Sequence, residues 1–240
     1  MLAHPDTGVF LHSAVKQVKN KNNKEASMYR LLSLILLLAG LSSQLAAAGH
    51  CDFPGQDIKP GIVKIVGDNA VGSGVVISTN RVLTAAHVIE GMKKIDVVIN
   101  GQAAPAGVVS RNLQTDLALL EVATRDIKPI KLRSGQLAGN APVWTMGYPF
   151  GKRLKTGTGH YRKVFNGAIY TSAPVNFGQS GGGLVSCENG EHVLSGIIRA
   201  FGAEYRNGKL VRRDDISVAS RTQDIRLFVN ASGQLASLTK

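Results

Sequence analysis

The sequence predicts an all-β protein built from antiparallel barrels, on three observations. Short runs rich in apolar and β-branched residues recur along the chain at fairly even spacing. Gly, Asn and Asp separate these runs, and the 27 glycines among 240 residues suit many tight turns. Helical periodicity is confined to one segment near the C-terminus. Many short strands with little helix are typical of β-barrels.

The expected strands fall into two sets with a linker between them. The first set is 62–66, 74–78, 81–85, 94–99 and 116–122, and the second is 142–148, 161–171, 182–186, 192–201 and 216–219. The linker is 123–140, which carries mixed charge and two glycines. We therefore expect an N-terminal barrel over about 57–125 and a C-terminal barrel over about 138–221. Ile225 and Phe228, three residues apart within 222–230, predict a short terminal helix.

Residues 1–48 are expected to be a leader that takes no part in the fold of 49–240. Arg30 precedes the apolar run Leu31–Leu41, and Ala46-Ala47-Ala48 has the small residues of a signal-peptide cleavage site. The run is shorter than the roughly 20 residues of a membrane-spanning helix. A signal peptide over 28–48 is therefore predicted, with an uncleaved anchor as the alternative and Met1 or Met28 as the start. Export follows, to the periplasm or out of the cell.

The exported part of the chain is basic. Residues 49–240 hold 23 Lys and Arg against 14 Asp and Glu, a net charge of +9. A basic surface favours anionic partners. Five of these cations lie in one stretch, namely Lys152, Arg153, Lys155, Arg162 and Lys163. This Lys152–Lys163 stretch is either a solvated loop or a contact for an anionic surface, and no specific nucleic-acid partner is expected.

The cysteines and histidines bear on redox state and metals. Cys51 and Cys187 both follow the leader, and in an oxidising compartment they could pair and pin the N-terminal tail. Neither has the neighbours of a catalytic thiol. His50, His160 and His192 have no metal-ligand spacing, so neither a catalytic metal nor a cofactor is expected.

Three residues carry the predicted chemistry. Ser180 lies in a glycine-rich turn, His87 follows Thr84-Ala85-Ala86, and Asp116 precedes an apolar run. A serine hydroxyl needs a base to take its proton, and imidazole titrates near neutral pH. A carboxylate holds the imidazole in one tautomer and stabilises its cation. Each piece alone is common, but the order His, Asp, Ser with gaps of 29 and 64 residues predicts a serine-protease triad.

The glycines around Ser180 predict an oxyanion hole. A developing oxyanion needs backbone N–H groups aimed at it, and Gly178 and Ser180 are the expected donors. Gly181 and Gly182 would keep space around the nucleophile.

These motifs resemble those of trypsin-like peptidases of the chymotrypsin fold. The matching segments are Gly72–Ile77, Leu83–Val88, Asp116–Leu120 and Gly178–Gly182, and Gly147–Gly151 resembles the bacterial HtrA-like branch. The likeness covers about 62–230. It implies two six-stranded antiparallel barrels with the active site in the cleft between them. It also implies an endopeptidase of proteins or peptides, in which His87 is the general base, Asp116 orients it and Ser180 is the nucleophile. HtrA-like proteins usually add a PDZ domain, and none is expected here.

By the same resemblance, 171–176, 198–201 and 216–219 line the specificity pocket. The residues expected to contact substrate are Ala173, Pro174, Ile198, Arg199 and Ala200. The first two segments contain no acidic residue, so an uncharged P1 residue is predicted, meaning the residue before the cut. Arg199 has three interpretations: it attracts acidic side chains, it pairs with Asp116, or it is a solvated charge.

Two other functions remain open from the sequence. A non-catalytic binding protein on a protease scaffold is the main alternative, since fold does not imply function. An esterase is weaker: Gly178–Gly182 has the form G-x-S-x-G, but the esterase fold places Ser before Asp and His. Gln179 replaces the Asp with which digestive enzymes bind a new N-terminus, so activation by that route is not expected. The sequence gives no lead on oligomeric state.

Overall fold

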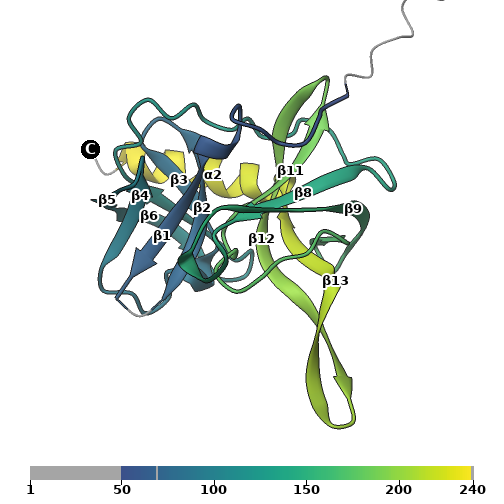
Figure 1. Cartoon of the computed structure of the whole chain (residues 1–240). Helices are drawn as coiled ribbons and strands as arrows, with labels where there is room; N and C mark the ends of the chain where they lie inside the picture. The colour runs from purple at the N-terminus through teal and green to yellow at the C-terminus, as the bar shows by residue number, and fades with distance from the viewer. Residues whose placement is uncertain (1–49, 69, 239–240) are drawn as a thin grey trace, which may run out of the picture. The chain divides into compact units, whose positions relative to one another are not determined.

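The computed structural model of the protein describes residues 50–68 and 70–238 (Figure 1). The leader, the signal peptide expected over 28–48 and Gly49 lie outside the described residues. The described chain forms a first β body, here the N-terminal sheet, and a second, here the C-terminal barrel. The helix α2 (Thr222–Leu238) follows them. The predicted all-β class is confirmed. In the described residues no helix has the length and apolar content needed to cross a bilayer.

The N-terminal sheet has seven antiparallel strands rather than the six expected. They are β1 (Ile62–Gly67), β2 (Val71–Ser78), β3 (Arg81–Thr84), β4 (Ile95–Ile99), β5 (Gln102–Pro105), β6 (Gly107–Asn112) and β7 (Leu117–Glu121). Their order is β5-β4-β1-β2-β3-β7-β6. The two edge strands, β5 and β6, are joined through Ala106 alone, whose N–H donates to the carbonyl of Ile95 at 2.9 Å. The sheet therefore curls until its edges meet, and one broken strand accounts for the seventh.

The C-terminal barrel is a closed ring of six strands, as expected. They are β8 (Pro142–Gly147), β9 (Lys155–Phe165), β10 (Ala168–Thr171), β11 (Gly183–Glu188), β12 (Glu191–Arg206) and β13 (Lys209–Arg221). The order around the ring is β10-β13-β12-β11-β8-β9. Three of its hairpins turn at an Asn-Gly pair with positive φ at both residues, at 166–167, 189–190 and 207–208. The first of these turns divides the single strand expected over 161–171 into β9 and β10.

The terminal helix packs against both bodies. Ile225 and Phe228 are buried, whereas Leu227 between them is exposed. The helix contacts β6 and β7 of the N-terminal sheet and β12 and β13 of the C-terminal barrel. Burying each large apolar side chain contributes about 1.5–3 kcal/mol. The helix therefore helps to hold the two bodies in one arrangement.

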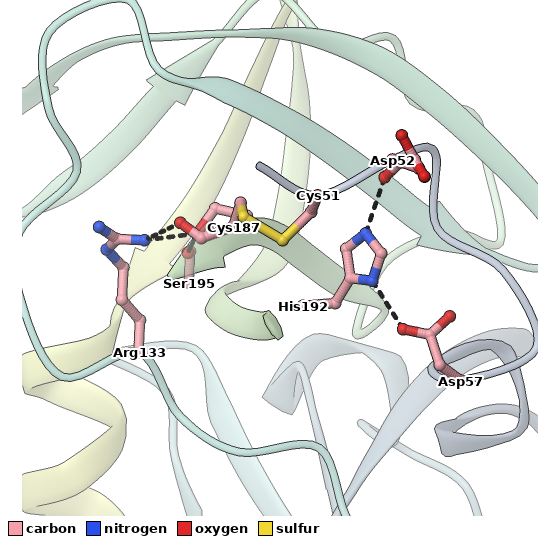
Figure 2. The surroundings of a disulfide bond; sticks show 8 residues. Cys51, Asp52, Asp57, Arg133, Cys187, His192 and Ser195 are labelled. Atoms are coloured by element: carbon pink, nitrogen blue, oxygen red, sulfur yellow. Dashed lines mark hydrogen bonds and ion pairs between the residues drawn. A yellow bond between two sulfur atoms is a disulfide. The ribbon is translucent and has the colours of Figure 1, made fainter. Parts of the chain in front are cut away.

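The N-terminal tail is attached to the C-terminal barrel. A disulfide bond joins Cys51 to Cys187 at the end of β11. Beside it, the imidazole of His192 lies between the carboxylate of Asp57, at 2.7 Å, and the carbonyl of Asp52, at 2.9 Å (Figure 2). Burial by itself would raise the pKa of Asp57, but its contacts with His192, together with hydrogen bonds from the backbone N–H groups of Asp57 and Gly55, outweigh this and hold the pKa below its ordinary value. Two independent contacts therefore anchor the tail.

Strands β12 and β13 continue past the barrel as a long two-stranded hairpin, here the β12–β13 hairpin (Figure 1). Pairing runs without interruption from Gly202 opposite Arg213 to Arg206 opposite Lys209. The expected strands 192–201 and 216–219 missed this extension because its sequence is charged rather than alternating. Cross-strand ion pairs support it instead, such as Arg213 with Glu204 at 2.6 Å.

Candidate active site

The structure brings His87 and Asp116 together at one end of the N-terminal sheet. Strands β3 and β7 are antiparallel neighbours, so the end of β3 lies beside the start of β7. His87 sits in a single 3-10 turn after β3, and Asp116 immediately precedes β7. Nδ1 of His87 is 2.9 Å from Oδ2 and 3.0 Å from Oδ1 of Asp116, and the backbone N–H of His87 donates to Oδ1 at 3.0 Å. The carboxylate thus fixes both the ring and its backbone.

Asp116 is held in its ionised form. The residue is buried, which by itself would raise the pKa of the carboxyl group. Hydrogen bonds from the ring and backbone of His87, together with the charges of His87 and Arg199, outweigh burial and hold the pKa below its ordinary value. An ionised carboxylate accepts the Nδ1 proton of His87, which leaves Nε2 as the acceptor nitrogen.

Arg199 points toward Asp116. Its Nε lies 3.5 Å from Oδ2, and the Arg199 side chain is 27% exposed. The register of β12 against β13 shifts between Ile198 and Ala200, so Arg199 is the extra residue of a β-bulge. Bulges beside active sites re-aim a side chain. Of the three interpretations of Arg199, the structure shows the pairing with Asp116.

The turn that carries Ser180 is fixed by contacts with the N-terminal sheet. The backbone N–H of Ser73 donates to the carbonyl of Ser180, and the Ser73 hydroxyl donates to the carbonyl of Gly178, each at 2.8 Å. Gly178 has φ of 87°, and a Cβ there would come within 2.7 Å of backbone atoms of Tyr148 and Phe150. Both the conformation and the close approach require glycine at this position.

Gly178 and Ser180 both line a cavity that is open to solvent. In the described part of the chain, the backbone N–H groups of Gly178 and Ser180 donate to no protein atom. The Ser180 hydroxyl makes a long contact, 3.5 Å, with the carbonyl of Arg199. Among the described residues no hydrogen bond joins this hydroxyl to His87, although both side chains line one cavity. Catalytic hydrogen bonds are often long before substrate binds.

This cavity, here the Ser180 cavity, has a volume of about 360 Å³. Its walls are mainly apolar and include Val71, Val88, Phe177, Ile198, Ala200 and Phe201. Of the five residues expected to contact substrate, Ile198 and Ala200 line it. Arg199 is turned to Asp116, and Ala173 is buried in the core of the C-terminal barrel. Pro174 lines a separate, larger cavity.

Arg212, on the β12–β13 hairpin, was not singled out from the sequence. Its guanidinium donates to the side-chain oxygen of Asn176 and to the carbonyl of Val175, both in the loop before Ser180. It also lies 4.9 Å from the centre of the Phe201 ring and pairs with Asp214 at 2.8 Å. A run of four charged residues, 212–215, marks this stretch in the sequence, but only the fold shows which of them faces the loop.

The described residues contain no group of three or more His, Cys, Asp or Glu side chains that could hold a metal ion.

Comparisons with known proteins agree with the geometry. A family model described as a trypsin-like peptidase domain matches residues 72–196. Over 146 residues the chain is 35% identical to a probable periplasmic serine protease do/HhoA-like of Haemophilus influenzae, covering 55% of this chain and 31% of that protein. It is 31% identical over 140 residues to the serine protease Do-like HtrA of Lactococcus lactis, covering 49% of this chain and 34% of that protein.

The fold has solved counterparts as well. A crystal structure of Rv3671c from M. tuberculosis H37Rv, in an inactive form, superposes with a TM-score of 0.62 at 21% identity, covering 78% of this chain and 98% of that one. The chain spans about a third of the length of the curated relatives it matches. Since the family model covers more than half of its residues, the chain belongs to the trypsin-like peptidase family, and its similarities lie with the HtrA-like serine proteases.

Proposed function

We propose that the protein is an exported serine endopeptidase with a triad of Ser180, His87 and Asp116. The observation that carries the proposal is the contact of His87 Nδ1 with the ionised Asp116, at 2.9 Å, beside a cavity shared with Ser180. This contact leaves Nε2 facing away from the carboxylate as the base. Family membership supports the same chemistry.

The proposed reaction proceeds in two halves. Nε2 of His87 takes the proton of Ser180 as Oγ bonds to the peptide carbonyl, whose oxygen gains the negative charge. The N–H groups of Gly178 and Ser180, which donate to no described protein atom, would hold that oxygen. The imidazolium then protonates the amine as the peptide C–N bond breaks, which leaves an acyl-enzyme on Ser180. Water that is deprotonated by His87 attacks the acyl carbon, the bond from that carbon to Oγ breaks, and His87 returns the proton to Ser180 as the acid product leaves.

An uncharged, small to medium apolar P1 residue fits the Ser180 cavity best. Its apolar walls include Ile198 and Ala200, and neither Asp, Glu, Lys nor Arg is among its lining residues. Asp215 directly precedes 216–219, one of the segments expected to line the pocket, but its carboxylate is paired with Arg213 at 2.8 Å. A P1 Lys or Arg would therefore be desolvated without a partner, at considerable cost.

Export is proposed from three observations. The segment 28–48 has the features of a signal peptide, and the Haemophilus relative is named as periplasmic. The disulfide between Cys51 and Cys187 suits an oxidising compartment.

A non-catalytic binding protein is the second candidate, and the missing hydrogen bond between Ser180 and His87 in the described structure favours it. Labelling with a fluorophosphonate, which bonds to an activated serine with loss of fluoride, separates the two. We expect one adduct, mapped by mass to Ser180, in the wild type and none in Ser180→Ala. His87→Ala should label far more slowly. A folded wild type that does not label would favour the binding protein.

A further inference from the structure

A second cavity, here the basic cavity, lies beside the loop that precedes Ser180. It has a volume of about 730 Å³, twice that of the Ser180 cavity, and shares only Asn176 with it. One wall comes from 149–157, which covers the β8–β9 connection and the start of β9, and the other from 174–179. This volume falls within the range of small-molecule sites.

The basic cavity carries positive charge without an internal counter-charge. Lys152, Arg153 and Lys155 line it, are exposed, and form no ion pair with any carboxylate of the described residues. Elsewhere on the barrel, arginines are paired, as Arg213 is with Asp215 and Arg221 with Asp224, each at 2.8 Å. No acidic residue lines the cavity. Three cations within four residues, beside a low-dielectric wall, attract an anion.

The interior of the basic cavity is apolar. Phe150, Pro174 and Val175 line it, and Phe150 is 57% exposed. The backbone N–H groups of Phe150 and Lys152 already donate to carbonyls of the protein, at 2.7 and 3.0 Å. These walls offer contact area for an apolar body but few donors for a peptide backbone.

We propose that the basic cavity binds a small anionic amphiphile, specifically a free fatty-acid carboxylate. Lys152, Arg153 and Lys155 would pair with the carboxylate, and the exposed Phe150 and Pro174 would cover the acyl chain. A phospholipid head group offers similar charge. A hollow of this size that lies between two loops suits a single enclosed chain better than a bilayer surface.

Occupancy of the basic cavity would act on the catalytic turn. Gln179 lines the cavity, and its side-chain oxygen accepts the backbone N–H of Asn176 at 2.8 Å, which closes the loop directly before Ser180. A ligand that binds more tightly when this loop is ordered would stabilise the turn that presents the N–H groups of Gly178 and Ser180. The size of the effect is set by the difference between its affinities for the ordered and the disordered loop. This regulatory step rests on the proposed function, whereas binding itself does not.

Binding is tested on the full chain carrying Ser180→Ala, by titration calorimetry with laurate below its micelle concentration. We expect saturable binding of one laurate per protein. Lys152→Glu with Arg153→Glu should weaken it at least tenfold, and so should Thr156→Trp, which fills the cavity and leaves the charges. The matched control, Arg111→Glu with Lys209→Glu, changes two exposed cations that lie on β6 and at the start of β13 and should bind as before.

Several results would overturn the site. The first is the absence of saturable laurate binding, and the second is an equal loss of laurate affinity in the control variant. The third is a protein that is retained on phosphatidylglycerol vesicles but does not bind laurate. Circular dichroism of each variant separates lost binding from lost folding. In the wild type, laurate should raise kcat on a peptide substrate. Laurate binding without a change in kcat would contradict the regulatory step. Laurate binding by a protein that is neither labelled by the fluorophosphonate nor able to cleave a peptide would contradict the proposed peptidase but support the site.

Discussion

At the scale of single residues, Asp116 has two cationic partners. His87 contacts it at 2.9 Å, and Arg199 approaches Oδ2 at 3.5 Å. In the proposed mechanism His87 becomes positively charged, and the same carboxylate would stabilise that charge. Arg199 offsets part of the negative charge of Asp116. We infer that Arg199 competes with His87 for this carboxylate and weakens its attraction for a positively charged ring.

Replacing Arg199 should therefore shift the pH profile of the proposed peptidase. In Arg199→Gln the whole charge of Asp116 acts on the His87 ring and stabilises positive charge there. The acid limb of kcat/KM should therefore move to higher pH. Arg199→Lys retains a cation and is the control. An unmoved limb with a lower kcat would show that Arg199 acts only by packing.

Sequence motifs predicted the candidate residues of this site, but not all of their contacts. His87, Asp116 and Ser180 stand in short motifs whose spacing can be read directly, and in the structure His87 contacts Asp116 and lines one cavity with Ser180. The partner of Arg199 could not be chosen in advance because its direction depends on a one-residue bulge in β12. A bulge arises from the pairing of two distant strands and leaves no local signal.

At the scale of elements, the β12–β13 hairpin supports the catalytic turn. Arg212 reaches from β13 to Val175 and Asn176, and its guanidinium lies against Phe201 on β12. One two-stranded element thus holds the loop that leads to Gly178 and Ser180. In the proposed peptidase, cleavage would depend on how accurately that loop places the oxyanion donors.

Removing the Arg212 contact should lower turnover more than binding. In Arg212→Ala the loop loses two hydrogen bonds, and misplacement of reacting groups by about 1 Å can cost about 100-fold in rate. We expect kcat to fall at least tenfold with KM changed little, measured on one peptide substrate. Lys209→Ala, at the exposed start of β13, is the matched control. A rise in KM at constant kcat would assign Arg212 to substrate binding instead.

Local signals also decided which elements could be foreseen. The Asn-Gly pairs at 189–190 and 207–208 lie between expected strands and form turns, because Asn and Gly tolerate positive φ. The pair at 166–167 also forms a turn, but it was overlooked within the single strand expected over 161–171. The helix was expected from the spacing of Ile225 and Phe228. By contrast, β5 and β6 were missed since their residues are mostly exposed and show no clear alternation. β5 pairs with β4 and β6 pairs with β7, and neither pairing is signalled by the local sequence.

At the scale of the whole molecule, the proposed active site exists only when the two bodies meet. His87 and Asp116 belong to the N-terminal sheet, and Ser180 belongs to the C-terminal barrel. Several contacts cross between the bodies: Ser73 to Ser180 at 2.8 Å, the Tyr148 hydroxyl to the carbonyl of Ile62 at 3.1 Å, and Lys64 to the carbonyl of Gly151 at 3.2 Å. Such long-range contacts could not be derived from motifs alone.

The disulfide adds stability to this assembly without entering the chemistry. It links positions 136 residues apart, and neither Cys51 nor Cys187 lines the Ser180 cavity. Cross-linking so long a segment restricts the unfolded chain. The variant Cys51→Ser with Cys187→Ser should therefore lose about 2–4 kcal/mol of unfolding free energy in urea and keep its kcat.

Two further measurements separate the contribution of the disulfide from that of the His192 contacts. Reductant should destabilise the wild type to the level of the double variant and leave that variant unchanged, since no other cysteine exists in the sequence. His192→Ala removes the second anchor of the tail, which is the contact of His192 with Asp57 and Asp52. It should lower the unfolding free energy by less than loss of the disulfide, because water can hydrogen-bond to both oxygen acceptors instead. If the double variant were as stable as the wild type, the tail would be held through His192 rather than through sulfur. A matching loss of kcat would instead mean that the tail positions the barrel against the N-terminal sheet, and that stability and catalysis are coupled through the same docking.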